Sequence, residues 1–151
     1  MIRMRKGRHA LKNERIMIDT NIFLDVLLNR ESLADSSSEF LELSENNVFT
    51  GLVTSSCITD IFYIVRKHLK STDAAYFAVG KILNIASVCD VTGSDVMLAY
   101  ERHARDFEDC LLAVCAISND CHCIVTRNKP DLSEFDIPCL TPEEWLAKRS
   151  E

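Results

Sequence analysis

The 151-residue sequence lacks the features that mark several large protein classes. No uninterrupted apolar run approaches the roughly 20 residues that cross a bilayer, and the N-terminus has no apolar core of a secretory signal. The four glycines and three prolines are too scattered to mark a linker or a domain boundary. We therefore expect one domain without a membrane span, located in the cytoplasm.

The seven cysteines do not follow a disulfide or zinc pattern. They are odd in number, form no CxxC pair and lie mostly inside apolar stretches, which is typical of buried, reduced thiols. Cys121-His122-Cys123 is the nearest approach to a soft-metal cluster. Alternate side chains of a strand point to opposite faces, however, and no second ligand pair follows at a useful spacing.

The formal charge of -6 is distributed unevenly along the chain. Residues 1–15 carry six basic residues against one acid, whereas the remainder carries 11 basic and 22 acidic residues, a net charge of -11. We expect residues 1–15 to form a disordered basic tail and residues 16–151 to form the domain. The acidic body should repel nucleic acid unless cations neutralise it, whereas the tail can bind phosphates without reading sequence.

Short apolar segments alternate with amphipathic ones. Strands are predicted at residues 16–18, 50–53, 87–91 and 122–126. Predicted helices run through Leu28, over 33–45, from a cap at Ser55 or Ser56 to Leu69, and over 73–83, 94–104 and 108–118, with a last one starting at Pro142 after a Thr141 cap. This alternation implies βαβ units and a mostly parallel sheet covered on both faces.

In such sheets the ligand site lies beyond the carboxyl ends of the strands. Chemistry is therefore expected just after Ile18, Val53, Val91 and Val125. In "IMIDTN", Asp19 follows the first strand directly. Asp, Thr and Asn are all favoured as helix N-caps, so Asp19 is either a cap or one wall of a metal site.

Asp60 interrupts the apolar segment "CITDIFYIV". Because burying an unpaired carboxylate costs at least several kcal/mol, something should neutralise it. Three alternatives stay open: a metal ion, Arg66 or Lys67 on the same helix, or simple exposure at the helix edge.

The densest acid cluster is "RDFEDCLLAVCA", where Asp106, Glu108 and Asp109 open the most apolar helix. Acids suit the positive end of a helix, and Asp106 with Asp109 resembles a capping pair. Three neighbouring carboxylates also repel one another, and they are tolerated more easily when they hold a divalent cation.

The segment "IVTRNKPDL" places further polar residues just past a strand. Thr126 and Asn128 stand there with Arg127 and Lys129, which could meet phosphate. The alternative is a polar turn before Pro130.

Four blocks in this order resemble a known family. "IMIDTNIFLDVLLNRE", "SSCITDIFYIVRK", "DFEDCLLAVCA" and "IVTRNKPDL…IPCLTPEEWL" are similar to successive blocks of PIN domains, the fold of VapC-type toxin ribonucleases, and especially of the bacterial branch with a TRN block. The resemblance spans Arg15 to Ala147. It implies a three-layer α/β/α fold whose mostly parallel central sheet has about five short strands.

The resemblance also implies a pocket that binds Mg²⁺ or Mn²⁺ and cuts single-stranded RNA. By position, its metal ligands and catalytic residues are Asp19, Asp60 and Asp109, with Asp106 as an extra catalytic acid. The residues implied to contact substrate are Thr20, Asn21, Thr126, Arg127 and Asn128. The chain departs from the family pattern at two positions, since Asp60 replaces a common Glu and Asn128 a common Asp. Asp131 could take over the role of the missing acid.

The implied partners are a small antitoxin protein and a second copy of the chain in a homodimer. The main alternative, favoured by Asn128, is a PIN-like module that binds RNA or a protein partner without cutting. Other phosphate-handling α/β folds fit less well, because no acid follows Val53, Asn21 stands where a dehalogenase-like site needs a second acid, and no Gly-rich phosphate motif occurs.

Overall fold

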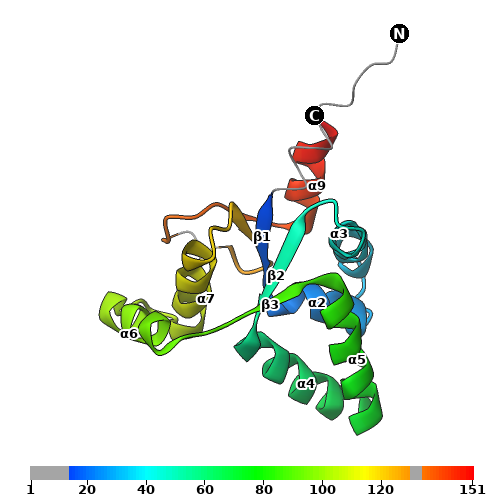
Figure 1. The fold of residues 1–151 in the computed structure, drawn as a ribbon. Coiled ribbons are helices and arrows are strands. Elements are labelled where there is room, and N and C mark those ends of the chain that lie inside the picture. The colour runs from blue at the N-terminus through cyan, green and yellow to red at the C-terminus, as the bar shows by residue number, and fades with distance from the viewer. Residues whose placement is uncertain (1–13, 130–133) are drawn as a thin grey trace.

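Five parallel strands form the central sheet of the computed structural model, which describes residues 14–129 and 134–151 (Figure 1). The spatial order is β3-β2-β1-β4-β5, and every neighbouring pair is parallel. The strands are β1 (Arg15–Ile18), β2 (Thr50–Thr54), β3 (Ser87–Cys89), β4 (Cys123–Val125) and β5 (Cys139–Leu140). The predicted α/β class and parallel sheet are confirmed.

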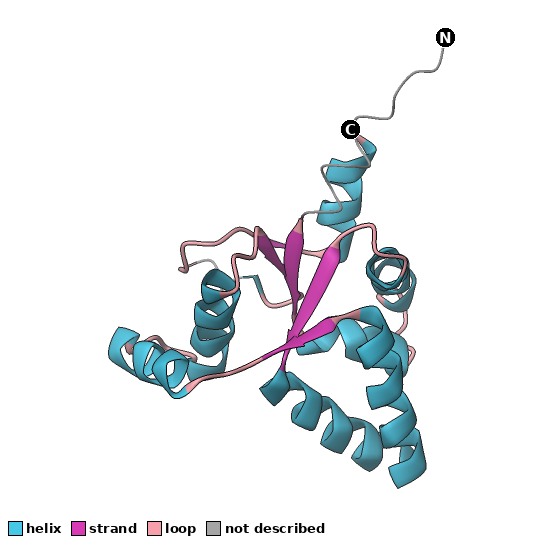
Figure 2. Ribbon diagram, viewed as in Figure 1, coloured by secondary structure: helices cyan, strands magenta, loops and turns pink. Residues whose placement is uncertain are grey.

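The helices lie in two layers around this sheet (Figure 2). They are α2 (Thr20–Leu27), α3 (Ala34–Glu45), α4 (Ser55–Leu69), α5 (Thr72–Ile85), α6 (Gly93–Arg102), α7 (Phe107–Ser118) and α9 (Pro142–Ser150). Figure 1 shows α6 and α7 on one side of the sheet and α2, α3 and α5 on the other, with α4 leaving the end of β2. This is the predicted three-layer arrangement.

Burial on both faces explains why the strands are short and apolar. Ile16, Met17 and Ile18 of β1 and Ile124 and Val125 of β4 are fully buried. Such strands in the middle of a parallel sheet have helices on either side, so every position can be hydrophobic. The predicted strand segments therefore form the buried centre of the core.

Polar caps begin the helices directly after the strands. Asp19 caps α2, and Thr54, the last residue of β2, accepts a hydrogen bond from the backbone N–H of Cys57 and so caps α4. The prediction of Ser55 or Ser56 as that cap was wrong by one residue, because β2 extends to Thr54. The Thr141 capping box of α9 is confirmed, with Glu144 as its other half.

Other differences lie at the edges of the sheet. β3 ends at Cys89 rather than at Val91, and β5 was not predicted because two residues carry no periodicity. Arg15, assigned to the basic tail, lies in β1, where its Nε donates to the Asn119 carbonyl at 2.8 Å. The rest of the tail assignment, residues 1–13, lies outside the described residues.

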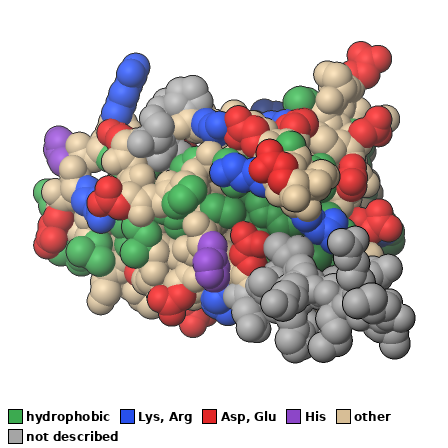
Figure 3. Space-filling model, turned by 90° about the horizontal axis from the view of Figure 1, so that it is seen from above, with side chains coloured by type: hydrophobic (Ala, Val, Ile, Leu, Met, Phe, Trp, Pro, Cys, Tyr) green, Lys and Arg blue, Asp and Glu red, His purple; other side chains and the backbone are tan. Residues whose placement is uncertain are grey.

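An aromatic cluster attaches the last helix to the domain. Trp145 of α9 packs against Phe40 of α3 and against Phe49 just before β2, with ring centroids 5.2 and 5.0 Å apart. Seen from above, this end of the molecule carries basic and acidic side chains interspersed around hydrophobic ones (Figure 3). Within the described residues, no helix is both long enough and apolar enough to cross a membrane.

The glycine at position 51 is required by close packing. A Cβ built there would lie 2.2 Å from Ser44 Oγ and 2.9 Å from Ile18 Cδ1, whereas one built at Gly80 meets nothing within 4 Å. We expect Gly51→Ala to lower the free energy of unfolding by about 1–3 kcal/mol through overpacking. Gly80→Ala, within α5, should raise it by up to about 1 kcal/mol because alanine favours helix. Urea denaturation of both variants checks this, and equal effects would contradict it.

Candidate active site at the carboxyl edge of the sheet

Two adjoining hollows lie beyond the carboxyl ends of β1 and β2, where the fold predicted chemistry. The inner hollow has a volume of about 190 Å³ and the outer one about 470 Å³, room for several waters at about 30 Å³ each. Both are lined by Asp19, Asp60, Glu108 and Asp109. The inner hollow adds Thr54, Ser56, Cys57, Phe107, Leu111 and Leu112, and the outer adds Thr20, Asn21, Leu24, Tyr63, Ile64, Asp106 and Asn128. We call the two together the acidic hollow.

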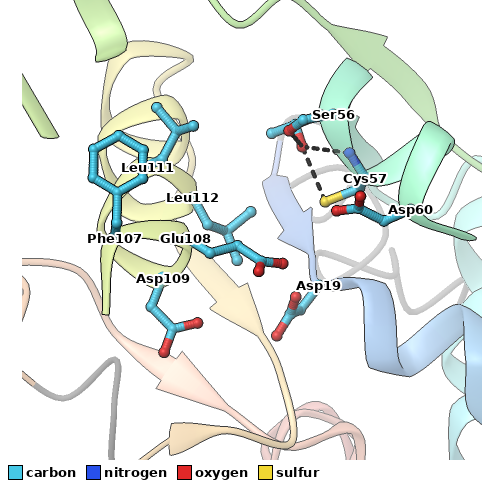
Figure 4. Close-up of a pocket in the computed structure, with 10 residues that line it drawn as sticks. Asp19, Ser56, Cys57, Asp60, Phe107, Glu108, Asp109, Leu111 and Leu112 are labelled. Atoms are coloured by element: carbon cyan, nitrogen blue, oxygen red, sulfur yellow. Dashed lines mark hydrogen bonds between the residues drawn. The ribbon is translucent and has the colours of Figure 1, made fainter. Parts of the chain in front are cut away.

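Three separate elements bring these carboxylates together. Figure 4 shows Asp19 at the end of β1, Asp60 on α4, and Glu108 and Asp109 on α7, all facing the same space. Asp19 follows β1 directly and Asp60 lies on α4, which follows β2, and the carboxyl ends of these neighbouring parallel strands share one edge. Asp109 meets them there from the first turn of α7. The residues are where the sequence analysis expected them; their chemical roles stay predictions.

Asp19 is both a helix cap and a wall of the hollow. Its Oδ1 accepts a hydrogen bond from the Thr20 backbone N–H at 2.7 Å, and its Oδ2 accepts one from Thr126 Oγ1 at 2.7 Å. Burial raises the pKa of this carboxyl, the two hydrogen bonds oppose the rise, and the nearby charge of Asp106 adds to it. A neighbouring cation would favour the charged form that burial disfavours.

Asp60 corrects an argument made from the sequence. It lies on the exposed side of α4, so exposure at the helix edge, the third alternative, is enough to account for its charge, and its role as a metal ligand stays a prediction. The inference that its carboxylate needed a partner to be buried was wrong, because periodicity alone did not show which face of α4 turns toward solvent. Its charge nonetheless acts on the hollow, since it raises the pKa of Glu108.

Asp106 and Asp109 form the predicted capping pair of α7. Asp106 is the exposed N-cap and accepts from the backbone N–H of Asp109 at 3.0 Å. Asp109 is buried, and its Oδ2 accepts a hydrogen bond from Asn128 Nδ2 at 3.1 Å. Asn128 therefore acts here as a hydrogen-bond donor to a carboxylate, where a second carboxylate would repel it.

Glu108 is a member of the site that the sequence analysis did not assign. It lines both hollows, and its pKa is raised first by desolvation and then by the charges of Asp60, Asp19 and Asp106. The acid cluster was the available signal. Choosing among neighbouring acids required the rotation of α7 about its axis, which packing determines.

The side chains of the loop after β4 contact different parts of the molecule. Thr126 is fully buried and donates to Asp19, while its Oγ1 accepts the backbone N–H of Asn128 at 2.9 Å. Asn128 reaches Asp109. Arg127, between them, points into the fold and lines neither hollow. Of the predicted substrate contacts, Thr20, Asn21 and Asn128 line the outer hollow, whereas Thr126 lines neither hollow and donates a hydrogen bond to Asp19.

The Arg127 guanidinium joins α2, α3 and α9 to this loop. Its Nε donates to Asp25 Oδ2 at 3.0 Å, and its Nη1 pairs with Glu143 Oε2 at 2.5 Å. Its Nη2 donates to Leu33 O, Ser36 Oγ and Ser37 Oγ at 3.3, 3.0 and 3.0 Å. Asp25 is 0% exposed, so Arg127 neutralises a buried charge. The expectation that Arg127 contacts substrate is not supported by this placement.

The residues present fit a hard divalent cation. Mg²⁺ binds through one or two carboxylates and keeps several waters, and the hollow offers four carboxylates beside free volume. Among residues 14–129 and 134–151, no three His, Cys, Asp or Glu side chains stand close enough to chelate an ion by themselves. Water ligands would have to complete the shell.

A buried hydroxyl beside Asp19 also indicates that the hollow holds water. Thr20 Oγ1 has no hydrogen-bond partner within the part of the chain that the structure describes. Its contact with the thiol of Cys57 does not meet hydrogen-bond geometry. Burial raises the pKa of that thiol, and the nearby hydroxyls of Thr20 and Thr54 oppose the rise. A water held in the hollow would satisfy this hydroxyl.

Breaking the buried ion pair should cost more than removing both of its members. We expect Arg127→Met to lower the free energy of unfolding by about 3–5 kcal/mol, because Asp25 is left buried with Arg30 at 3.4 Å as its remaining cation and Ser37 Oγ at 2.7 Å as a neutral donor. Asp25→Asn combined with Arg127→Met should recover most of that loss. Lys129→Met, which breaks the more exposed pair with Glu144, should cost below about 1 kcal/mol. Urea denaturation measures all three, and additive losses would contradict the prediction.

The same network predicts a dependence of stability on acid pH. Partial burial alone raises the pKa of Glu143, but hydrogen bonds from Arg127 and Ser36 lower it to about 2, below the ordinary 4.5. Because the folded pKa lies below the unfolded one, the stabilisation is complete above about pH 4.5 and is lost as pH falls toward 2. Glu143→Gln should therefore have a lower free energy of unfolding than the parent at pH 5, and the difference should shrink as the pH falls. A difference that stays constant from pH 5 to pH 2.5 would argue against this. Glu42→Gln, at an exposed position of α3, is the control.

Comparison with known proteins agrees with this geometry. Ribonuclease VapC1 of Aquifex aeolicus (strain VF5) is 26% identical over 143 residues, which cover 91% of this chain and 97% of that protein. The fold is similar to the crystal structure of VapBC2 from Rickettsia felis bound to a DNA fragment from their promoter, with a TM-score of 0.66, 20% identity and coverage of 84% of this chain and 98% of that one.

A second solved structure, Mycobacterium tuberculosis VapC20, described as a Sarcin-Ricin loop cleaving toxin, has a TM-score of 0.65 and 13% identity. The matched region covers 80% of this chain and 95% of the VapC20 chain. At these identities the two structures establish the fold alone. Residues 15–130 match the family described as PIN domain, which is most of the sequence. With the parallel sheet and the acidic hollow at its carboxyl edge, this match shows that the chain belongs to the PIN domain family.

Proposed function

We propose that this chain is a divalent-metal-dependent endoribonuclease that hydrolyses phosphodiester bonds of single-stranded RNA. The observation that carries the proposal is the set of four carboxylates, from β1, α4 and α7, that face one hollow in a PIN domain. The name of the Aquifex relative, a ribonuclease matched over 97% of its length, supports this activity. Mg²⁺ or Mn²⁺ is the proposed cofactor.

Asp19, Asp60 and Asp109 would hold the ion together with water ligands, since among the described residues no three such side chains stand close enough to chelate it alone. When bound, a divalent ion lowers the pKa of a water for attack and offsets negative charge on the scissile phosphate. Thr126 holds the Asp19 carboxylate in one orientation, and Asn128 does the same for Asp109. Thr20 and Asn21 line the outer hollow, where they would contact the RNA.

A proton must leave the attacking water. Glu108 is suited to accept it, because burial and the neighbouring charges of Asp60 and Asp19 raise the pKa of its carboxyl. Asp106 or Asp60, on either side of the hollow, would orient that water by accepting hydrogen bonds. Each of these steps uses an oxygen that lines the hollow.

We also propose that the protein is the toxin of a toxin-antitoxin pair and acts in the cytoplasm. The Rickettsia structure, a VapBC2 assembly on DNA from its promoter, supports an antitoxin partner, and the description of VapC20 as a toxin supports the same assignment. A small antitoxin would silence the enzyme by covering the acidic hollow, and a homodimer is the proposed oligomeric state.

Asn128 favours one competing function, a module that binds RNA or protein without cutting. An amide at this position removes a negative charge from the hollow, so that the site attracts a cation less strongly. The two functions differ in metal binding, since an inert module has no need of it. Isothermal calorimetry with Mn²⁺ therefore separates them.

We expect the parent protein to bind Mn²⁺ and to cut single-stranded RNA only with metal present. Asp19→Asn should reduce cleavage by at least about 100-fold, because removing even a group that only orients a ligand costs 10- to 100-fold. Asn128→Asp should tighten Mn²⁺ binding by adding a carboxylate. Asp35→Asn, an exposed change in the first turn of α3, is the matched control and should change neither property.

No Mn²⁺ binding by the parent at millimolar metal would support the inert module instead. Unimpaired cleavage by purified Asp19→Asn would rule out the metal mechanism. Circular dichroism of each variant shows whether a loss of activity reflects a loss of fold.

A further inference from the structure

The acidic hollow lacks the groups that usually hold a polyanion. Within the described residues, no Lys, Arg or His lines either the inner or the outer hollow. A bound cation can neutralise one phosphate, but the neighbouring nucleotides must be held by other contacts. On single strands such contacts come from base stacking as well as from charge.

An exposed aromatic ring stands on the α7 side of the carboxylates. Phe107, the first residue of α7, is 48% exposed and lines the inner hollow, as does Leu111 one turn later. Single exposed apolar residues are common on protein surfaces, so exposure alone means little. The position matters here, because neither a metal ion nor a phosphate benefits from an apolar wall. Figure 4 shows Phe107 on α7, with Asp60 across the hollow on α4.

A cation held by a second aromatic ring stands on the α4 side. Tyr63 is 60% exposed and lines the outer hollow, next to the same four carboxylates. Arg66, one helical turn further along α4, has its Cζ 5.4 Å from the centroid of that ring. A cation-π contact at this distance holds the guanidinium beside the hollow while leaving its N–H groups able to meet a phosphate.

We infer that single-stranded RNA crosses the acidic hollow from α7 to α4, with one unpaired base stacked on Phe107 and a backbone phosphate met by Arg66 on Tyr63. The scissile phosphate then lies between them, over Asp19, Asp60, Glu108 and Asp109. This path rests on the proposed function and adds the substrate contacts that the carboxylates cannot supply. Because stacking needs an open base face, the site selects unpaired RNA over duplex.

The chain offers a matched control for both contacts. Phe77 of α5 is 68% exposed, and Lys81 lies over its ring at 5.6 Å, a second exposed cation-π pair. Both residues line a different, apolar groove between α2, α4 and α5. Substitutions there should leave RNA cleavage unchanged.

The first experiment measures Phe107 by steady-state cleavage of a short single-stranded RNA with Mn²⁺. Phe107→Ala should raise KM by about 5- to 100-fold, the range of stacking effects per base, with kcat nearly unchanged. An RNA with one abasic position should impose the same penalty on the parent and little further penalty on Phe107→Ala. Phe77→Ala should behave as the parent, and Phe107→Leu, which keeps bulk without an aromatic face, should resemble Phe107→Ala.

The second experiment measures Arg66 by the salt dependence of RNA affinity. Arg66→Met should reduce the slope of log affinity against log salt by about 0.7, the loss of one phosphate contact on a single strand, whereas Lys81→Met should not change it. Anisotropy of labelled RNA in Ca²⁺ gives this slope separately from turnover.

Three outcomes would overturn the path. The first is an unchanged KM for Phe107→Ala, and the second is an abasic RNA that raises KM equally for the parent and for Phe107→Ala. The third is that Phe107→Ala changes the oligomeric state measured by light scattering while its RNA affinity stays that of the parent, which would assign Phe107 to a protein contact. If the parent cuts no RNA, the proposed function fails, and anisotropy still decides the path. Equal RNA affinity of parent, Phe107→Ala and Arg66→Met would then exclude it.

Discussion

The buried contact between Arg127 and Asp25 organises the molecule around the acidic hollow. Asp25 of α2 is withdrawn from water, and Arg127 reaches it from the loop after β4 while also binding α3 and α9. On either side of Arg127, Thr126 donates a hydrogen bond to Asp19 and Asn128 donates one to Asp109. A planar guanidinium suits this position, since it forms several directed hydrogen bonds at once.

The carboxylates of the acidic hollow repel one another, which is unfavourable for the folded chain. Four carboxylates share one space, and burial raises the pKa of Asp19 while the neighbouring charges help to raise that of Glu108. Like charges so placed are unfavourable unless a cation joins them. In the proposed function, a bound cation would reverse the local sign and so let an acidic protein act on RNA, while the aromatic rings at the rim would supply contacts that do not depend on charge.

Much of this arrangement could be predicted from the residues. The strands over Ile16–Ile18 and Ile124–Val125, the Thr141 cap and the place of Asp19 after the first strand follow from local periodicity and from the geometry of parallel sheets. The grouping of Asp60 and Asp109 with Asp19 was implied by the resemblance to PIN domains. Local patterns could not predict that Asp60 is exposed, that Glu108 lines the site or that Arg127 points into the fold. Each depends on how a helix or loop rotates as it packs, and one-dimensional patterns do not carry that angle. Asp131, a possible substitute for the missing acid, lies outside the described residues.

The sequence by itself determined most of the strands and helices, though not the two-residue β5, and therefore that Asp19 follows a strand at the carboxyl edge of the sheet. Only the tertiary structure decided which of those groups share a hollow and which serve the fold. Asn128 shows the division: its identity is plain in the chain, but its hydrogen bond to Asp109 depends on how the loop after β4 packs beside α7. The physical reason is that secondary structure arises from neighbours in sequence, whereas the direction of a side chain is set by packing among segments distant in sequence.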